Sequence, residues 1–169
     1  MKKIGILSDT HGFWDDRFEV HLADCDEIWH AGDVGDWSII ERLNEISLVR
    51  AVSGNIDHGT VRRNLRETEI FNCEDIKVLL THIGGYPGRW AAGMNPILRQ
   101  KGIRLAIAGH SHILKIMYDQ QLDLLYINPG AAGQQGWHTV RTLVKLVVDG
   151  GNMRDCEVIE LSNRKIQQC

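Results

Sequence analysis

Short apolar runs alternate with amphipathic or polar segments along the first half of the chain. Trp37, Ile40, Leu43 and Ile46 recur every third residue, which indicates a helix packed on a sheet. The apolar runs typical of buried strands are Lys3–Ser8, Glu27–His30, Leu48–Val52, Lys77–Thr81 and Leu105–Ala108. The segments between them that favour helices are Asp15–Ala23, Trp37–Ile46, Gly59–Thr68 and Ala91–Gln100.

The second half is mostly strand-like. Asp149-Gly150-Gly151-Asn152 is a strong hairpin signal between the last two strands. The expected strands are Ile113–Tyr118, Leu122–Asn128, Thr142–Asp149 and Cys156–Leu161. We therefore predict an α/β fold of the four-layer α+β type, with two mixed β-sheets packed as a sandwich and flanked by helices. No repeat or linker interrupts the pattern, so we expect one domain over residues 1–169.

Composition narrows the environment in which this chain works. Its 169 residues are 43% hydrophobic and 24% charged, an ordinary balance for a globular protein. A net charge of -3 gives no bulk attraction to nucleic-acid polymers or anionic membranes. No apolar run approaches the roughly 20 residues of a membrane span, and we read no signal peptide. The four cysteines form no C-x-x-C pair, which fits reduced thiols and a cytoplasmic location.

Polar residues follow five of the predicted strands, each set beside a glycine. In an extended strand, residues two apart point to the same side, so we expect Asp9 and His11 to project together. Asp36 is expected to cap the helix at Trp37 instead of joining this set. The strand-end set is Asp9, His11, Asp33, Asn55, His82, His110 and His112. Ligands in layered α/β folds gather at the carboxyl ends of strands, so these side chains should meet.

Seven oxygen and nitrogen donors can hold two metal ions if one carboxylate bridges them. Carboxylate, amide and imidazole ligands without a thiolate suit divalent transition metals. We expect two divalent ions, with Mn preferred and Ni, Co, Fe, Zn or Mg as alternatives. Two such ions can activate water and clamp the attacking and leaving oxygens of a phosphoryl displacement.

The order of these motifs resembles the calcineurin-like metallophosphoesterase superfamily, and in detail its small YfcE-like phosphodiesterase branch. The phrases that carry the resemblance are Ser8-Asp9-Thr10-His11-Gly12, His30-Ala31-Gly32-Asp33, Gly54-Asn55-Ile56-Asp57, Gly109-His110-Ser111-His112 and Asn128-Pro129-Gly130. The resemblance implies one metal held by Asp9, His11, Asp33 and His112. It implies a second metal, bridged by Asp33 and bound by Asn55, His82 and His110. A water or hydroxide between the ions would be the nucleophile.

Two positions depart from the pattern of the family. Relatives that hydrolyse phosphomonoesters commonly carry histidine after the motif asparagine, where it can protonate the leaving group. This chain has Ile56 there, and Asp57 or His58 would replace that histidine only if geometry allows. Ala131 also stands where the branch usually has serine, which removes a hydroxyl near the site. The missing acid favours phosphodiesters over monoesters.

Several residues near the motifs keep two interpretations. Asp33, Asn55 and Asp57 are the catalytic candidates, although Asp57 is favoured as an acceptor for backbone or histidine N–H groups over an acid catalyst. His30 is either a partner that orients a metal ligand or a half-buried strand-end residue. Trp14 is expected to pack in the core more than to wall a pocket. His138 is expected to be structural, with a place in the substrate pocket as the alternative; Arg62, Arg63 and Arg66 should form a solvated helical face.

Three functions compete at this point. The first is metal-dependent hydrolysis of a small phosphodiester, and the second is hydrolysis of a small-metabolite phosphomonoester. The third is a non-catalytic interaction scaffold, because a eukaryotic retromer subunit resembles this fold with an impaired metal site. The complete set of seven ligand residues favours an enzyme over the scaffold. A homo-oligomer is an open alternative, since scattered tryptophans and the late β-region offer surfaces for it.

Overall fold

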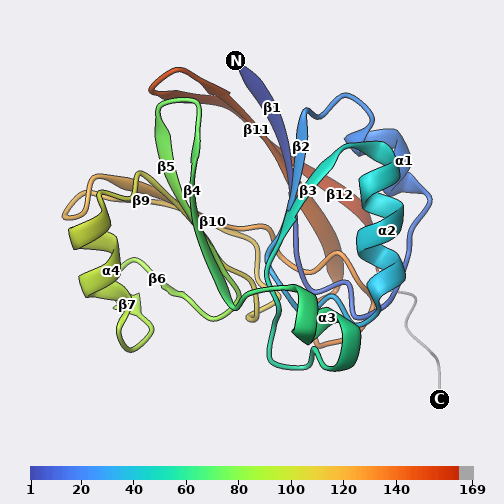
Figure 1. The fold of residues 1–169 in the computed structure, drawn as a ribbon. Coiled ribbons are helices and arrows are strands. Elements are labelled where there is room, and N and C mark those ends of the chain that lie inside the picture. The colour runs from blue at the N-terminus through green and yellow to red at the C-terminus, as the bar shows by residue number, and fades with distance from the viewer. Residues whose placement is uncertain (164–169) are drawn as a thin grey trace.

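Two five-stranded β-sheets lie face to face, with helices on their outer sides (Figure 1). The computed structural model describes residues 1–163. The first sheet has the strand order β12-β11-β1-β2-β3, and the second has the order β4-β5-β8-β10-β9. Parallel pairs β1–β2 and β2–β3 stand beside antiparallel pairs β1–β11 and β11–β12. The predicted sandwich of two mixed sheets is therefore confirmed.

The elements follow the chain in an order close to the expected one. The strands of the first sheet are β1 (Lys2–Leu7), β2 (Glu27–His30), β3 (Leu48–Ala51), β11 (Val140–Asp149) and β12 (Asn152–Asn163). Those of the second sheet are β4 (Thr68–Cys73), β5 (Ile76–Thr81), β8 (Leu105–Ile107), β9 (Lys115–Asp119) and β10 (Leu124–Asn128). A small ribbon consists of β6 (Gly85–Tyr86) and β7 (Arg89–Trp90). The helices are α1 (Arg17–Leu22), α2 (Trp37–Ile46), α3 (Gly59–Asn64) and α4 (Met94–Lys101).

Alternation along the strands builds the core between the sheets. Ile4 and Ile6 of β1 are fully buried against the second sheet, whereas Leu7 packs with α1 and α2 on the outer side. Helix α2 spans the predicted residues, and the Asp36 side chain accepts a hydrogen bond from the Ser38 backbone N–H, as expected of an N-cap. Trp14 packs edge-on against Phe18, which agrees with its expected place in the core.

The structure differs from the prediction between residues 59 and 73. The arginine-rich segment was expected to be helical through Thr68, but α3 ends at Asn64. Strand β4 follows and pairs with β5 at the edge of its sheet. It was missed because its half-exposed, alternating residues lack the apolar run that marks a central strand.

The sequence also favours reduced cysteines, and it contains no apolar run long enough for a membrane span. Cys25, Cys73 and Cys156 are free cysteines, and burial raises the pKa of Cys25 and Cys73 to about 11. Cys169 lies outside the described residues. Among the helices of residues 1–163, none is long and apolar enough to cross a membrane.

Candidate metal centre

The loop after β1 carries Asp9 and His11 in an unexpected backbone conformation. Strand β1 ends at Leu7, and Asp9 and His11 have φ values of 56° and 49°. The expectation that strand alternation aims both side chains is therefore wrong. A left-handed turn places them instead, fixed by backbone hydrogen bonds from Asp9 N to Gly32 O and from His11 N to Asp33 O, each 3.0 Å long.

Left-handed backbone recurs at the other strand ends. Within residues 1–163, eight non-glycine residues have positive φ, and five of them belong to the predicted ligand set. The five are Asp9, His11, Asp33, His110 and His112. Such conformations cost a non-glycine residue about 1–3 kcal/mol and persist where surrounding structure enforces them, often at functional sites. This concentration of left-handed backbone at the predicted ligands indicates a functional site, separately from the sequence motifs.

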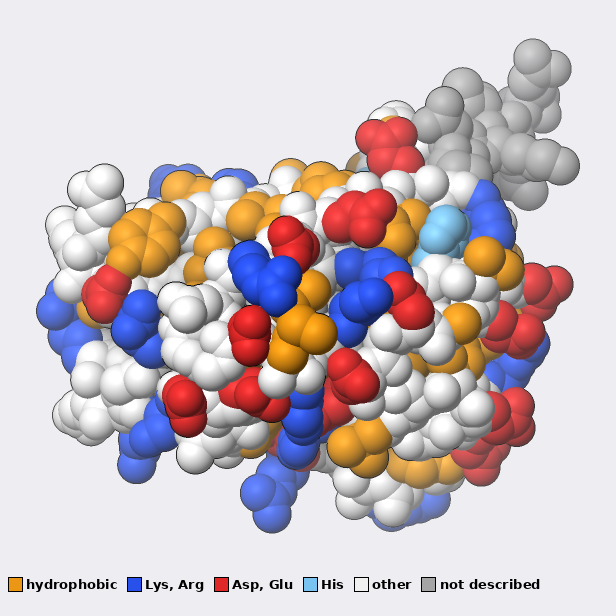
Figure 2. Space-filling view, turned by 90° about the horizontal axis from the view of Figure 1, so that it is seen from above, with side chains coloured by type: hydrophobic (Ala, Val, Ile, Leu, Met, Phe, Trp, Pro, Cys, Tyr) orange, Lys and Arg blue, Asp and Glu red, His pale blue; other side chains and the backbone are white. Residues whose placement is uncertain are grey.

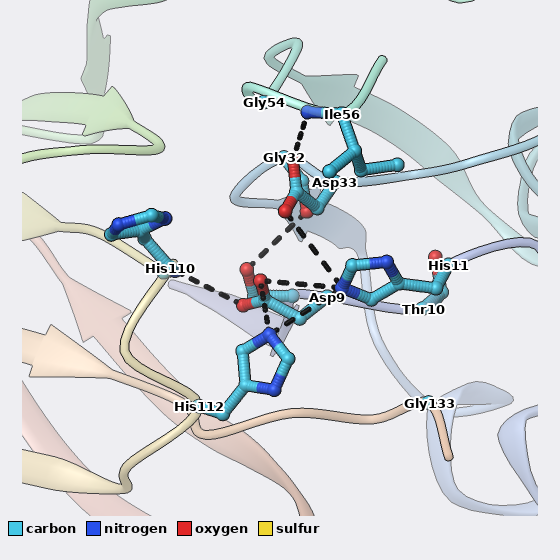
Figure 3. Close-up of polar contacts among 12 residues, drawn as sticks. Asp9, Thr10, His11, Gly32, Asp33, Gly54, Ile56, His110, His112 and Gly133 are labelled. Carbon is cyan, nitrogen blue, oxygen red and sulfur yellow. Dashed lines mark hydrogen bonds and ion pairs between the residues drawn. The ribbon is translucent and has the colours of Figure 1, made fainter. Parts of the chain in front are cut away.

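The Asp9 carboxylate lies at the centre of this arrangement (Figure 3). It is fully buried, and its Oδ1 atom has no hydrogen-bond partner within the part of the chain that the structure describes. His112 Nε2 lies 3.1 Å from Oδ1, and the Nε2 atoms of His11 and His82 lie 4.0 Å from it. The Nε2 atoms of His11 and His112 are themselves 3.4 Å apart. Three imidazole nitrogens and a carboxylate oxygen therefore converge on one small volume.

Asp33 and His82 form the other half of the centre. Asp33 Oδ2 lies 3.2 Å from His82 Nε2 and 3.7 Å from His11 Nε2. His82 Nδ1 lies 2.8 Å from Ala31 O, so it carries a proton and donates it to that carbonyl. This bond leaves Nε2 of His82 directed at Asp33 and at Asn55 Oδ1, which is 3.0 Å away.

The structure contains two groups of possible metal ligands, and the donor atoms within each group lie within 4.8 Å of one another. They are Asp9–His11–His112 and Asp9–Asp33–His82, so Asp9 is common to both. The His110 ring belongs to neither group and packs edge-on against His82, with ring centroids 5.2 Å apart. His110 contributes its backbone N–H, which donates to Asp9 Oδ2 at 3.2 Å.

Burial and neighbouring charge shift the proton affinities of these groups in different directions. Burial lowers the pKa of His11 despite the nearby Asp33 and Asp9 carboxylates. For His82, burial acts in the same direction, but the hydrogen bond to Asp33 and the two carboxylates outweigh it and raise the pKa. Burial would raise the pKa of Asp33, yet His82 and the Ile56 backbone N–H hold it below its usual value. The carboxylates of Asp9 and Asp33 therefore each lie close to imidazole nitrogens.

Glycines allow the backbone to approach the proposed ligand side chains closely. A Cβ at Gly54 would lie 2.0 Å from Asp33 Oδ1, and one at Gly32 would lie 2.7 Å from His82 Nδ1. A Cβ at Gly109 would lie 2.8 Å from Asp9 Oδ2. A side chain at any of these three positions would collide with a proposed ligand, so glycine is required there.

His30 supports the loops that carry the donors. It is fully buried at the end of β2, where its Nδ1 accepts from the Gly32 backbone N–H at 3.2 Å. Its Nε2 then carries the proton and donates to Thr10 Oγ1 at 2.9 Å. Burial lowers the pKa of His30 to about 4, so the ring is neutral at neutral pH. His30 thus positions Thr10, between Asp9 and His11, and Gly32, beside Asp33.

Asp57 joins two of the ligand-bearing loops. Its Oδ2 accepts from the backbone N–H groups of Gly54 at 2.7 Å and Val34 at 3.1 Å, and its Oδ1 accepts from Gly35 N–H at 2.7 Å. Three backbone N–H groups thus occupy both oxygens of the Asp57 carboxylate. These contacts favour the acceptor interpretation of Asp57 over that of a proton donor.

One anchoring interaction near the site carried no sequence signal. Arg141 of β11 is buried and forms an ion pair with Asp15, in the loop after β1. Arg141 Nε also donates to Ala132 O at 2.9 Å. No motif connects residues 126 positions apart, so only the fold reveals that this pair ties the loop after β1 to β11 beside the centre.

The donor set fits divalent cations. An unsatisfied buried carboxylate oxygen facing several imidazole nitrogens needs a positive partner, which a metal ion supplies. Asp9, His11, Asp33, His82 and His112 converge directly. Asn55 lies at the edge of the group through its contact with His82.

Comparison with known proteins places this geometry in a family. The sequence model of the calcineurin-like phosphoesterase superfamily domain matches residues 1–151. The chain belongs to this superfamily. Membership of the calcineurin-like phosphoesterases supports metal-dependent hydrolysis of phosphoesters.

Individual relatives agree with this assignment. A probable metallophosphoesterase of Methanocaldococcus jannaschii is 36% identical over 135 residues, which are 76% of this chain and 67% of that protein. A probable metallophosphoesterase of Methanothermobacter thermautotrophicus is 28% identical over 162 residues, covering 92% of this chain and 91% of that protein. Wild-type Vps29 of Entamoeba histolytica, solved as a Zn²⁺ complex, shares the fold with a TM-score of 0.70 at 19% identity, over 94% of this chain and 98% of that one.

Proposed function

We propose that this calcineurin-like phosphoesterase hydrolyses phosphodiesters with two divalent metal ions. Asp9, His11, Asp33 and His112 would hold one ion, and Asp33, Asn55, His82 and His110 the other. Mn²⁺ is the preferred occupant. When bound, the ions supply Lewis-acid activation of water and neutralise the charge that develops on phosphate.

The observation that carries this proposal is the buried Asp9 Oδ1 atom. It has no hydrogen-bond donor among residues 1–163, yet the Nε2 atoms of His11, His82 and His112 lie 3.1–4.0 Å away. A structural carboxylate at this depth would have hydrogen bonds to both of its oxygens, whereas Asp9 has one only to Oδ2. The arrangement is therefore that of ligands aimed at a cation.

The residues around the donors keep them in place during turnover. The Ala31 carbonyl fixes the tautomer of His82, and the Ile56 backbone N–H holds Asp33 Oδ1 at 3.0 Å. Asp57 holds the loops of Asp33 and Asn55 together, because its carboxylate accepts hydrogen bonds from backbone N–H groups of both loops. This preorganisation would let the donor atoms hold the metal ions without rearrangement when a phosphoester binds.

The position of Ile56 supports a diester as substrate. Its side chain is 39% exposed beside the centre and offers no proton to a leaving group. His58, the nearest alternative, is exposed, and its Nδ1 lies 3.1 Å from Ile56 O. Esters with good leaving groups depend least on a general acid.

Replacing Asp33 by asparagine tests the proposal. Asp33→Asn preserves shape but removes the negative charge shared between His11 and His82. We expect Mn²⁺-stimulated hydrolysis of bis(p-nitrophenyl) phosphate to fall at least about 100-fold, with fewer Mn²⁺ ions bound per chain by calorimetry. Asp16→Asn is the matched control, because Asp16 is an exposed carboxylate with 93% of its side chain accessible. Near-normal turnover and metal content in Asp33→Asn would show that this centre neither binds the metal nor catalyses the hydrolysis.

A non-catalytic scaffold is the second candidate, because the fold is shared with Vps29 at 19% identity. The same assay separates the two functions. A scaffold predicts no metal-dependent hydrolysis of any mono- or diester by the wild-type chain, whereas the enzyme predicts turnover lost with Asp33.

A further inference from the structure

Two pockets of different chemistry border the proposed centre. One, the aromatic pocket, has a volume of about 370 Å³ and is lined by His110, His112, Ile113 and Trp137, among others. The other, the hydroxyl pocket, has a volume of about 260 Å³ and is lined by Asn55, Arg62, Glu67, Thr68, Thr81 and His82, among others. Figure 3 shows Gly54 of the hydroxyl pocket and His112 of the aromatic pocket on opposite sides of Asp9.

The aromatic pocket exposes apolar surface beside the proposed metal ligands. Trp137 is fully exposed, and Ile113 is 61% exposed. An exposed indole beside a concave site offers a ligand a large apolar face together with one N–H donor. Its flat face suits a planar ring, because stacking on an aromatic side chain does not require one particular base or substituent.

The residues on either side of Trp137 in the chain both lie close to His112. Gly136 lies so close to His112 that a Cβ there would be 2.2 Å from His112 Nδ1. The His138 ring packs edge-on against His112, with centroids 5.2 Å apart, and its Nε2 lies 2.9 Å from Gly133 O. The two neighbours of Trp137 in the chain thus both lie against the proposed metal ligand His112, so Trp137 lines the pocket on that side of the proposed centre.

Polar groups line part of the hydroxyl pocket, beside the apolar side chains of Ile83 and Met94. Arg62 is exposed on α3, as expected, and it also donates to Ser53 Oγ at 3.2 Å and Gly54 O at 3.5 Å and pairs with Glu67. Thr68 and Thr81 hydroxyls lie 2.9 Å apart in the same pocket. A guanidinium, a carboxylate and two hydroxyls side by side provide donors and acceptors for a group that carries hydroxyls.

We infer that the substrate is an unsymmetrical phosphodiester, with a planar aromatic group in the aromatic pocket and a hydroxyl-bearing group in the hydroxyl pocket. The inference rests on the proposed function and extends it to substrate class. A monoester has one organic group and would leave one pocket empty, whereas a diester occupies both. Hydrolysis adds a water oxygen to phosphorus, breaks one ester P–O bond and transfers a proton to the departing alkoxide, so no co-reactant is needed.

Binding of two product-like probes tests the aromatic pocket. Adenosine 5′-monophosphate and ribose 5-phosphate share phosphate and sugar, but only the first has a planar base. We expect the Mn²⁺-loaded wild type to bind adenosine 5′-monophosphate about tenfold more tightly by calorimetry. Trp137→Ala should abolish this difference, and Trp137→Phe should restore most of it. Tyr118→Ala, an exposed aromatic position of β9 that lines neither pocket, should leave it unchanged.

A second pair of probes tests the hydroxyl pocket. Propyl p-nitrophenyl phosphate and 2,3-dihydroxypropyl p-nitrophenyl phosphate differ only in two hydroxyls. We expect the dihydroxypropyl ester to have a KM about fivefold lower in the wild type. Thr68→Val should reduce this advantage, and Thr60→Val, at an exposed threonine of α3, should not.

The outcomes separate substrate class from function. Equal affinity for the two phosphates, or a difference that persists in Trp137→Ala, overturns the aromatic assignment. Equal KM values for the two diesters overturn the hydroxyl assignment. Absence of all metal-dependent turnover would instead remove the proposed function, and the binding ratio of the two phosphates does not depend on turnover.

Discussion

At the scale of single residues, the proposed centre combines strained backbone with unsatisfied polarity. Asp9 has a left-handed backbone and a buried carboxylate oxygen without a hydrogen-bond donor in residues 1–163. Both features oppose stability, and both occur at one residue. Their coincidence is typical of a position kept for chemistry.

Substitution at His110 measures the backbone part of this cost. His110 has φ of 69°, a conformation that glycine adopts freely and alanine does not. We expect His110→Gly to be more stable than His110→Ala by about 1 kcal/mol in urea unfolding of the metal-free protein. At Thr60, inside α3, the order should reverse, because glycine destabilises a helix relative to alanine. Equal or lower stability for the glycine variant at position 110 would contradict the strain.

On the proposed function, the side chain at position 56 limits protonation of the leaving group. Replacing it by histidine would place an imidazole on the residue whose backbone N–H contacts Asp33. We expect Ile56→His to raise turnover of a sugar phosphate by about 10-fold or more, since a positioned general acid contributes 10²–10⁴-fold. Ile56→Gln is the control, because its amide is polar but cannot act as the acid. If both variants behave alike, protonation at this position does not limit monoester hydrolysis.

At the scale of elements, the site depends on how loops are joined after the strands end. Asp57 connects the loops after β2 and β3, and His30 connects the loops after β1 and β2. The Asp15–Arg141 pair connects the loop after β1 to β11. Each connection is a buried polar contact, so each holds a loop with little freedom.

The Asp15–Arg141 pair makes stability depend on pH. Burial disfavours the Asp15 carboxylate, but hydrogen bonds from Arg17 and Arg141 outweigh it and hold the pKa of Asp15 well below its usual range. Because this pKa is lower in the folded than in the unfolded chain, the stabilisation is complete above about pH 4 and is lost as pH falls below it. We expect Asp15→Asn to lower the free energy of unfolding by about 3 kcal/mol at pH 7.

The difference between wild type and Asp15→Asn should shrink as pH is lowered from 4 toward 3. Urea unfolding at several pH values measures it, with Asp16→Asn as the neighbouring exposed control. A difference that stays constant across this range would show that the carboxylate charge is not the source of the stabilisation.

At the scale of the whole molecule, the two ends of the sandwich are unlike. Strands β1, β2 and β3 run parallel, so the loops after them gather at the lower end of Figure 1, around the proposed centre. Figure 2 looks onto the other end, where acidic and basic side chains are interleaved. Ion pairs there include Met1 N with Glu74 at 3.0 Å and Arg154 with Asp149 at 3.3 Å. Such exposed pairs contribute little stability and leave that end without one dominant charge.

Sequence patterns predicted the layers of this fold because buried strands leave apolar runs and α2 leaves a regular apolar spacing. They missed β4 and the β6–β7 ribbon, whose residues are partly exposed and whose strands are short. The motifs identified the donors that converge on Asp9. The left-handed backbone that orients them depends on contacts between loops, which no local pattern records. The separate placement of the His110 ring and the Asp15–Arg141 pair follows from the same long-range packing.

The left-handed residues have a consequence for the history of this sequence. Asp9, His11, Asp33, His110 and His112 each hold a conformation that glycine would adopt with less strain. While turnover is under selection, purifying selection keeps these side chains despite that strain. In a lineage released from that selection, glycine or asparagine would accumulate there and the protein would become more stable. Substitutions at these five positions would therefore indicate whether a descendant copy still catalyses hydrolysis or has kept only the fold.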